Sequence, residues 1–182
     1  NATYGETAWR ALVGIYERRS EIGLVGMHIN IKTGRWTESY SGIGSNVDSF
    51  YEYLCKHYVL FGNDEAWTMC DTMYKSVIEH LKDGDFYLDA NMKSGKVMRR
   101  NFNNLQAFWP GLQVMLGHLP VAERTANAFY RVWRNFGFTP EDFDFSQWRL
   151  HKSRGKSKYP LRPELIESTF HLYRATNDST WL

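Results

Sequence analysis

A repeated turn constrains the fold of this chain more than any other feature of its sequence. Asn30-Ile-Lys-Thr-Gly-Arg35 and Asn91-Met-Lys-Ser-Gly-Lys96 share the pattern Asn-x-Lys-Thr/Ser-Gly-Lys/Arg. Each turn lies between short alternating segments, residues 25–36 and 86–98, as in a β-hairpin whose glycine supplies a positive φ. Repetition on this scale indicates stacked supersecondary units.

Around these hairpins the apolar residues recur at helical steps of three and four. Glycines at 62, 117 and 137 are placed to close three of the helices. The stretch 139–158 has no such turn, and we expect it to be irregular. The unit is helix, hairpin, helix and tight turn, so the chain should be mainly α. The predicted helices cover residues 7–19, 47–61, 65–81, 104–116, 121–136 and 163–175.

The segment from Tyr159 to Arg174 contains Leu-Arg-Pro-Glu-Leu-Ile-Glu at the start of a predicted helix. Pro163 suits a first helical position, because its missing N–H costs nothing there. Glu164 and Glu167 then lie one turn apart near the positive end of the helix dipole. An ordinary acidic first turn explains the same spacing.

Two further motifs precede this one. Gly42-Ile-Gly-Ser-Asn-Val-Asp48 is followed by Ser-Phe-Tyr-Glu-Tyr-Leu, and Leu105-Gln-Ala-Phe-Trp-Pro-Gly-Leu-Gln113 comes later. Together with Leu-Arg-Pro-Glu-x-x-Glu, these stretches resemble glycoside hydrolase family 47, the class I α-1,2-mannosidases. The stretch from Leu105 to Gln113 is similar to the subgroup of endoplasmic-reticulum degradation-enhancing α-mannosidase-like proteins. The resemblance covers essentially residues 1–182.

The resemblance implies a fold and an activity. The fold is an α/α toroid, part of an (α/α)7 barrel with short β-hairpins between helices, in which the loops carrying Asp48, Asn104 and Glu164 converge at one end. The activity is inverting hydrolysis that trims mannose from high-mannose N-glycans of misfolded glycoproteins. Glu164 matches the base, and Asp48 matches a second essential acid that is either base or electrostatic support. Without the resemblance, the favoured interpretation of Asp48 is a cap for the helix that follows.

Substrate binding is expected at Arg162, Glu167, Glu52 and Asn104. Arg162 would orient a carboxylate or a sugar hydroxyl through its fork of donors. Glu52 follows Asp48 on the same helix face. Glu167 would accept hydrogen bonds from sugar hydroxyls or from waters around calcium, a cation that prefers oxygen ligands. Arg162 is otherwise an ion-pair partner of Glu52 or Glu164.

The resemblance also implies Ca²⁺ as cofactor, with no direct protein ligand in this chain. The family's calcium-binding threonine aligns beyond residue 182 and its general acid before residue 1. Residues 1–182 are therefore expected to be one partial catalytic domain, inactive by itself. The implied location is the lumen of the endoplasmic reticulum. An oxidoreductase there is a candidate partner, which the sequence does not decide.

Three residues depart from the family pattern. Ser45 and Asn46 replace small, flexible positions, and Asn103 replaces an acidic residue. Asn46 and Asn103, together with the short length of the chain, favour an alternative function, in which a glycan-binding, lectin-like protein keeps the pocket but turns over slowly. Retention of Asp48 and Glu164 favours the enzyme.

Composition adds limits. A hydrophobic fraction of 43% and an aromatic fraction of 16% predict a folded core, in which most rings belong. A net charge of +2 indicates no nucleic-acid partner, and the basic run at 151–158 is expected to be a solvated loop or, less simply, a phosphate-binding arm. The histidines lack ligand spacing, so we expect none to bind metal.

Two cysteines, Cys55 and Cys70, lie on adjacent predicted helices. Cys55 falls inside an apolar helical run, where a free thiol packs like a small hydrophobic side chain. We therefore expect a buried free thiol rather than a disulfide. The acceptor pattern for N-glycosylation occurs at Asn1 and Asn177, which is compatible with a secretory location.

Overall fold

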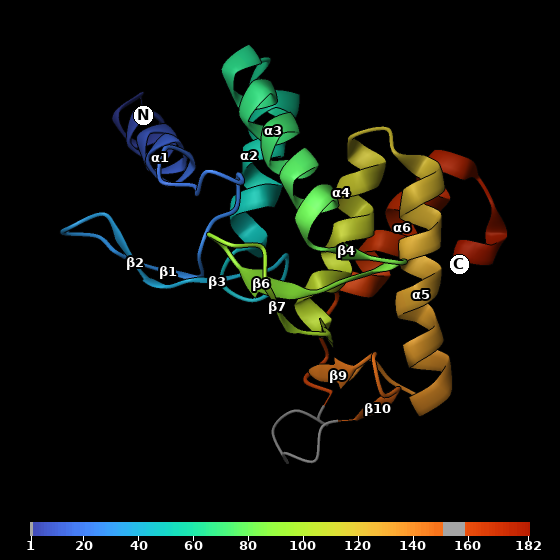
Figure 1. Ribbon diagram of the computed structural model, residues 1–182. Coiled ribbons are helices and arrows are strands. Elements are labelled where there is room, and N and C mark those ends of the chain that lie inside the picture. The colour runs from blue at the N-terminus through green and yellow to red at the C-terminus, as the bar shows by residue number, and fades with distance from the viewer. Residues whose placement is uncertain (1, 151–158) are drawn as a thin grey trace.

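The computed structural model describes residues 2–150 and 159–182, in which helices alternate with short strands (Figure 1). The α-helices of this part of the chain are α1 (Ala2–Tyr16), α2 (Asp48–Phe61), α3 (Asp64–His80), α4 (Trp109–Met115), α5 (Leu119–Phe136) and α6 (Glu164–Thr176). The 3-10 helices are η1 (Asn104–Phe108) and η2 (Ser179–Trp181). The strands are β1 (His28–Asn30), β2 (Arg35–Glu38), β3 (Tyr40–Ser41), β4 (Lys82–Asp83), β5 (Phe86–Tyr87), β6 (Asp89–Asn91), β7 (Val97–Arg99), β8 (Asn101–Asn103), β9 (Asp142–Asp144) and β10 (Arg149–Leu150).

The strands form small antiparallel sheets that link successive units. The hairpin β1–β2 and the ribbon β4–β5 are two-stranded. β3 leaves the first hairpin and pairs with β6 of the second hairpin, β6–β7. β8 leaves the second hairpin and pairs with β9 of a third hairpin, β9–β10. Each later hairpin thus receives the strand that leaves the one before it, so the loops after β3 and β8 lie at the same end of the helices (Figure 1).

The third hairpin corrects the expectation of an irregular stretch at residues 139–150. In the two predicted turns, the asparagine Oδ1 accepts from two later amides, and the closing glycine has a positive φ. Asp144 accepts from the amides of Ser146 and Gln147 in the same way, and Trp148 takes the φ of 50°. The Trp148 ring packs against Phe143, with centroids 5.0 Å apart. A tryptophan at the glycine position therefore hides the repeat. The predicted basic loop at 151–158 lies outside the described residues, as does Asn1.

The helices follow the predicted periodicity with differences at their ends. α1 begins before residue 7 and ends at Tyr16. The predicted helix 104–116 is divided into η1 and α4, and Pro110 lies in the first turn of α4, where its missing N–H is tolerated. Pro163 is the N-cap residue of α6 and not its predicted first helical residue, because the helix begins one position later at Glu164.

The expectation of a free thiol at Cys55 is wrong, because Cys55 and Cys70 form a disulfide. α2 ends at Gly62 in a left-handed conformation, and the side chain of Asn63 caps α3 by accepting from the amide of Ala66. This short turn makes the two helices antiparallel neighbours. Cys55 and Cys70 lie at similar distances from the turn on the facing sides, with Cα atoms 5.2 Å apart. The apolar run had indicated burial correctly but not the partner across the turn.

Aromatic side chains fill the core, as expected. Trp109 is 0% exposed and meets the ring of Tyr74 in a stacked arrangement. Gln113 donates from Nε2 to the hydroxyl of Tyr87 at 2.9 Å and of Tyr74 at 3.3 Å. Burial raises the pKa of Tyr87 to about 12, so this network stays neutral. Across residues 2–150 and 159–182, every helix lacks the length and apolar character that a membrane crossing requires.

Candidate active site

The loop between β3 and α2 delivers Asp48 as the first residue of α2. Asn46 in this loop has a φ of 72°, a left-handed conformation that asparagine tolerates better than most residues. The replacement of a flexible position by Asn46 therefore preserves the path of the backbone. Gly44 packs tightly, since an added Cβ would come within 2.8 Å of Cγ of Gln106. The loop is thus held against η1, and Asp48 is held with it.

Asp48 is half-buried, and its Oδ1 accepts from the amide of Ser49 at 2.8 Å. Val47, not Asp48, is the N-cap residue of α2, so the capping interpretation of Asp48 does not hold in its simple form. Burial raises the pKa of the Asp48 carboxyl, and the nearby Glu52 carboxylate raises it further. The positive charge of Arg162 acts in the opposite direction.

Glu164 begins α6 and lies within electrostatic reach of Asp48. Burial is the main cause that raises the pKa of Glu164, and the charges of Asp48 and Glu167 add to it, whereas Arg162 lowers it. One oxygen of Glu164, Oε2, is buried and has no hydrogen-bond partner among the described residues. A carboxylate oxygen buried in this way is a candidate for contact with a ligand, because unpaired buried polar groups are costly and uncommon.

The sequence offered Glu52 or Glu164 as an ion-pair partner of Arg162, but the structure shows a different partner. The guanidinium of Arg162 binds the carboxylate of Glu141 through two hydrogen bonds, of 2.9 and 2.6 Å. Sequence reasoning missed Glu141, which lies in the segment taken as irregular. No signal in the sequence singles it out, because the equivalent positions before the other two hairpins are the apolar residues Met27 and Leu88.

The other predicted binding residues differ in their surroundings. Glu52 forms an ion pair with Lys56 at 2.6 Å on the same helix. Glu167 is exposed, and its Oε1 lies 3.8 Å from Nε2 of His171. Asn104 is fully buried, and its side-chain amide donates to the carbonyl of Thr139 at 3.3 Å. Asn104 thus fastens the segment between α5 and β9 to η1, while its Oδ1 has no hydrogen-bond partner in the described part of the chain.

A groove of about 250 Å³ adjoins the cluster through Glu141, whereas Asp48, Arg162, Glu164 and Glu167 are not among its lining residues. Ser45, Asn103, Gln106 and Glu141 form part of its wall. Asn103 Oδ1 accepts from Ser45 Oγ at 3.2 Å, and Asn103 Nδ2 donates to the Glu141 carbonyl at 2.9 Å. Two departures from the family pattern, Ser45 and Asn103, therefore contact each other in the wall of the groove.

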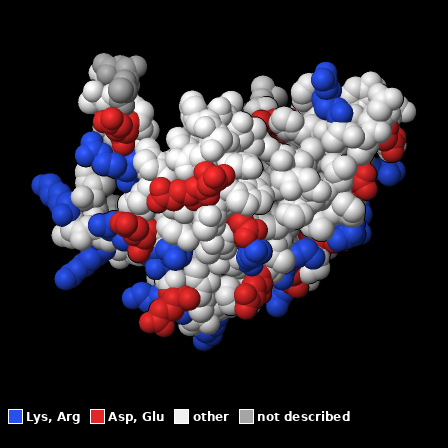
Figure 2. Space-filling view, turned by 90° about the horizontal axis from the view of Figure 1, so that it is seen from above, with Lys and Arg blue, Asp and Glu red and all other residues white. Residues whose placement is uncertain are grey.

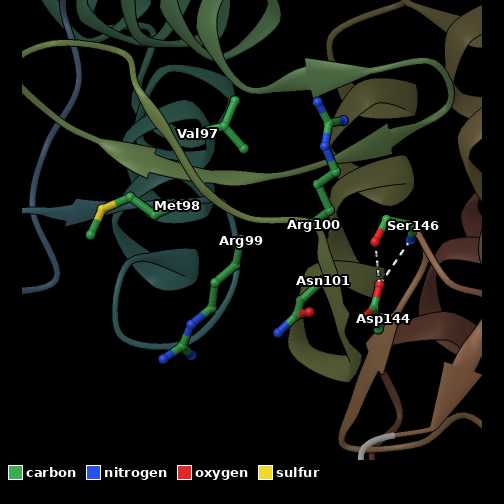
Figure 3. Close-up of a pocket in the computed structure, with 7 residues that line it drawn as sticks. All are labelled: Val97, Met98, Arg99, Arg100, Asn101, Asp144 and Ser146. Atoms are coloured by element: carbon green, nitrogen blue, oxygen red, sulfur yellow. Dashed lines mark hydrogen bonds between the residues drawn. The ribbon is translucent and has the colours of Figure 1, made fainter.

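A second depression lies farther along the strands, lined by Val97, Met98, Arg99, Arg100, Asn101, Asp144 and Ser146 (Figure 3). Its polar groups do not converge. Asp144 is occupied by the hydroxyl and amide of Ser146, and Arg99 and Arg100 point in different directions. Acidic and basic side chains also intermingle over the face seen in Figure 2.

In the ranges that the structure describes, no three His, Cys, Asp or Glu side chains are close enough to hold a metal ion. The structure instead places the separate carboxylates of Asp48 and Glu167 within electrostatic reach of Glu164.

Alternating helices and hairpins, with the carboxylates of Asp48 and Glu164 brought within electrostatic reach, define part of an α/α barrel. The sequence profile described as Glycosyl hydrolase family 47 matches residues 1–182. The chain belongs to this family, as the motifs indicated.

Individual relatives agree with this assignment. The chain is 47% identical over 179 residues to Alpha-mannosidase I MNS4 of Arabidopsis thaliana, which covers 98% of the chain and 28% of that protein. It is 42% identical over 180 residues to ER degradation-enhancing alpha-mannosidase-like protein 2 of Homo sapiens. This match covers 98% of the chain and 31% of that protein. The chain thus spans about a third or less of these relatives, so their activities are those of longer proteins.

A solved structure confirms the fold. The α-1,2-mannosidase from Trichoderma reesei superposes with a TM-score of 0.80 at 24% identity, over 100% of this chain and 45% of that one. At this identity the likeness supports the fold alone. The predicted α/α barrel architecture with short hairpins is confirmed.

Proposed function

We propose that the protein containing this chain is an inverting α-1,2-mannosidase that trims high-mannose N-glycans of misfolded glycoproteins. The observation that carries this proposal is the pairing of Asp48 and Glu164. Both carboxyls have raised pKa values, mainly through burial, and Glu164 keeps a buried oxygen that has no partner in the described residues. A raised pKa makes a carboxylate a stronger base near neutral pH.

The roles follow from the positions of the groups. In an inverting glycosidase, a base activates water on one face of the sugar while an acid on the opposite face protonates the leaving oxygen, with about 6.5–9.5 Å between the two carboxyls. Glu164 takes the proton of the water through its free oxygen, and Asp48 supports the positive charge that develops on the sugar. The general acid is expected from a part of the protein outside residues 1–182.

Binding is assigned to the polar groups around the two acids. Arg162 orients a sugar hydroxyl with the donors that Glu141 leaves available, and Glu52 and Glu167 accept hydrogen bonds from hydroxyls. Asn104 places the loop that borders them. These assignments extend the family membership to individual residues of this chain.

The described residues offer calcium no set of direct ligands, so their carboxylates would act on the ion through its waters. Carboxylate oxygens that are unpaired or exposed suit a hard cation and its waters, and Glu167 would hold such waters without binding the ion directly. Bound calcium supplies orientation of the sugar hydroxyls. Residues 1–182 thus form part of one catalytic domain in this proposal.

The proposed location is the lumen of the endoplasmic reticulum. A human relative is named as ER degradation-enhancing, and the Cys55–Cys70 disulfide suits an oxidising compartment. Asn177 is exposed at the C-cap of α6, where a glycan would be tolerated. An oxidoreductase partner stays a prediction from the resemblance.

A glycan-binding function with slow turnover is the second candidate. Asn103 favours it, because this neutral side chain brings no charge to the groove. Its Oδ1 accepts from Ser45 Oγ and from the amide of Leu105, and its Nδ2 donates to the Glu141 carbonyl.

The test is mannose release by the full-length protein. Incubation with a high-mannose glycan, followed by proton NMR of the freshly released sugar, should show mannose as the β-anomer first, which identifies inversion. Release of the α-anomer would contradict the mechanism. Tight glycan binding without release would support the second candidate.

A further inference from the structure

Arg162 reaches Glu141 across the space between two loops, and the geometry of the pair is specific. Nε of Arg162 donates to Oε2 of Glu141 at 2.9 Å, and Nη2 donates to Oε1 at 2.6 Å. The two side chains are 34% and 24% exposed. Parallel hydrogen bonds of this kind fix the plane of the guanidinium as well as its distance.

Glu141 is itself held by the neighbouring loops. Its carbonyl accepts from Asn103 Nδ2 at 2.9 Å and from the amide of Asn104 at 3.3 Å. Asn103 is fixed in turn by Ser45 Oγ at 3.2 Å. The loops after β3 and β8 therefore both determine where the carboxylate of Glu141 stands.

The backbone before Arg162 is also constrained. Leu161 has a φ of 57°, a left-handed conformation that is unfavourable for leucine. Such a conformation persists where surrounding contacts determine it, and it is frequent at functional sites. Arg162, the residue that follows Leu161, makes such a contact through its ion pair with Glu141.

We propose that Glu141 is a positioning residue of the active site, which acts through Arg162 by holding the guanidinium beside Asp48 and Glu164 without letting it pair with either. The inference rests on the proposed function for its catalytic consequence. It assigns to Ser45 and Asn103 a common task, the placement of Glu141, which neither residue shows from the sequence.

The charges around the two acids make the arrangement testable. Arg162 lowers the pKa of Asp48 and Glu164, and Glu141 offsets part of that positive charge. Without the Glu141 carboxylate, the guanidinium would be free to approach both acids, and their pKa values should fall. The other charged groups of this cluster are Glu52 and Lys56 on α2 and Glu167 and His171 on α6.

The experiment measures the pKa of Glu164 and turnover in the same variants of the full-length protein. Glutamate labelled with ¹³C at the carboxyl is titrated by NMR, and the Glu164 signal is assigned by its loss in Glu164→Gln. Glu141→Gln removes the charge, whereas Glu141→Asp keeps it. Asp83→Asn is the matched control, because it breaks another arginine–carboxylate pair, that with Arg100, away from the site.

Glu141→Gln should lower the pKa of Glu164 by about 1, as an opposite charge at close range does. It should also reduce kcat by about 10²-fold, the cost of a small misplacement of reacting groups, with glycan binding changed much less. Glu141→Asp should keep the pKa and recover part of the rate, and Asp83→Asn should change neither.

An unchanged pKa of Glu164 in Glu141→Gln would overturn the proposal even if the protein is a mannosidase. A lowered pKa in a protein that releases no mannose would refute the proposed function and leave the placement of Arg162 by Glu141 supported. Equal losses of kcat in Glu141→Gln and Asp83→Asn would show that the loss comes from general destabilisation of the fold, and this would contradict the positioning role.

Discussion

Glu164 combines two properties that a purely structural glutamate would not need. Its position at the start of α6 favours the ionised form through the helix dipole, yet burial raises its pKa. Its Oε2 also lacks a hydrogen-bond partner within residues 2–150 and 159–182. Holding a charged group in this state costs stability, and such costs are common at sites whose function requires them.

This cost predicts a dependence of stability on pH. Because the folded state raises the pKa of Glu164 and of Asp48, it binds protons more tightly than the unfolded state does. The free energy of unfolding should therefore fall as pH rises from the unfolded pKa values, about 4, through the raised folded values, and then level off.

The measurement is the Tm of the full-length protein and of Glu164→Gln and Asp48→Asn between acidic and neutral pH. Each neutral variant should be more stable than the unmutated protein at pH 7, and the difference should disappear below about pH 4. Variants less stable at pH 7 would show that these carboxylates stabilise the fold instead.

At the scale of elements, the helix pair α2–α3 carries Asp48 at the start of α2 and a disulfide midway along α2. The bridge closes a loop with a sequence separation of 15. By the loop-closure estimate such a bridge contributes about 3 kcal/mol, because it restricts the unfolded chain. The bridge therefore supports the helix on which Asp48 sits without touching the site.

Replacing both cysteines, in Cys55→Ala with Cys70→Ala, should lower the free energy of unfolding by about 2–4 kcal/mol while the pKa values of the site stay in place. Chemical denaturation of this variant measures the loss. In the unmutated, unreduced protein, mass spectrometry after thiol alkylation should show neither cysteine modified. Alkylation of both cysteines in the native, unreduced protein would restore the expectation of free thiols.

The sequence predicts elements well where one residue type carries the signal. Gly34 and Gly95 marked two hairpins because few other residues take their φ. The third hairpin stayed hidden because Trp148 takes the same conformation with support from aromatic packing. The disulfide was missed because helical periodicity reports the buried face but not which residues meet across a turn.

The candidate site divides in the same way. Asp48 and Glu164 lie in long motifs, and the structure brings them within electrostatic reach. Their proposed roles stay predictions. Glu141 and its bond to Arg162 could not be predicted, since the pair depends on how the third hairpin returns to the start of α6. The sequence indicated only that Asn103 removes a charge from the pocket wall. In the structure its side-chain amide accepts a hydrogen bond from Ser45 and donates one to the Glu141 carbonyl.

At the scale of the whole molecule, the hairpin end collects the loops while the helices extend away from it (Figure 1). Calcium is expected to act at this end in the full-length protein. Removal of calcium by a chelator should abolish mannose release and weaken glycan binding, and added Ca²⁺ should restore both. Glu167→Gln should weaken glycan binding, because its proposed role is to hold waters and hydroxyls. Full release in the presence of excess chelator would contradict the calcium proposal.

The central claim is that Glu164 is the base of a mannosidase, and mannose release by Glu164→Gln beside glycan binding tests it most directly. The substitution keeps the shape and removes the proton acceptor, so kcat should fall by about 10²–10⁴-fold while binding of the same glycan survives. Glu65→Gln is the matched control, since Glu65 is an exposed first-turn acid on α3, and it should release mannose at the normal rate. Undiminished release by Glu164→Gln would contradict the account.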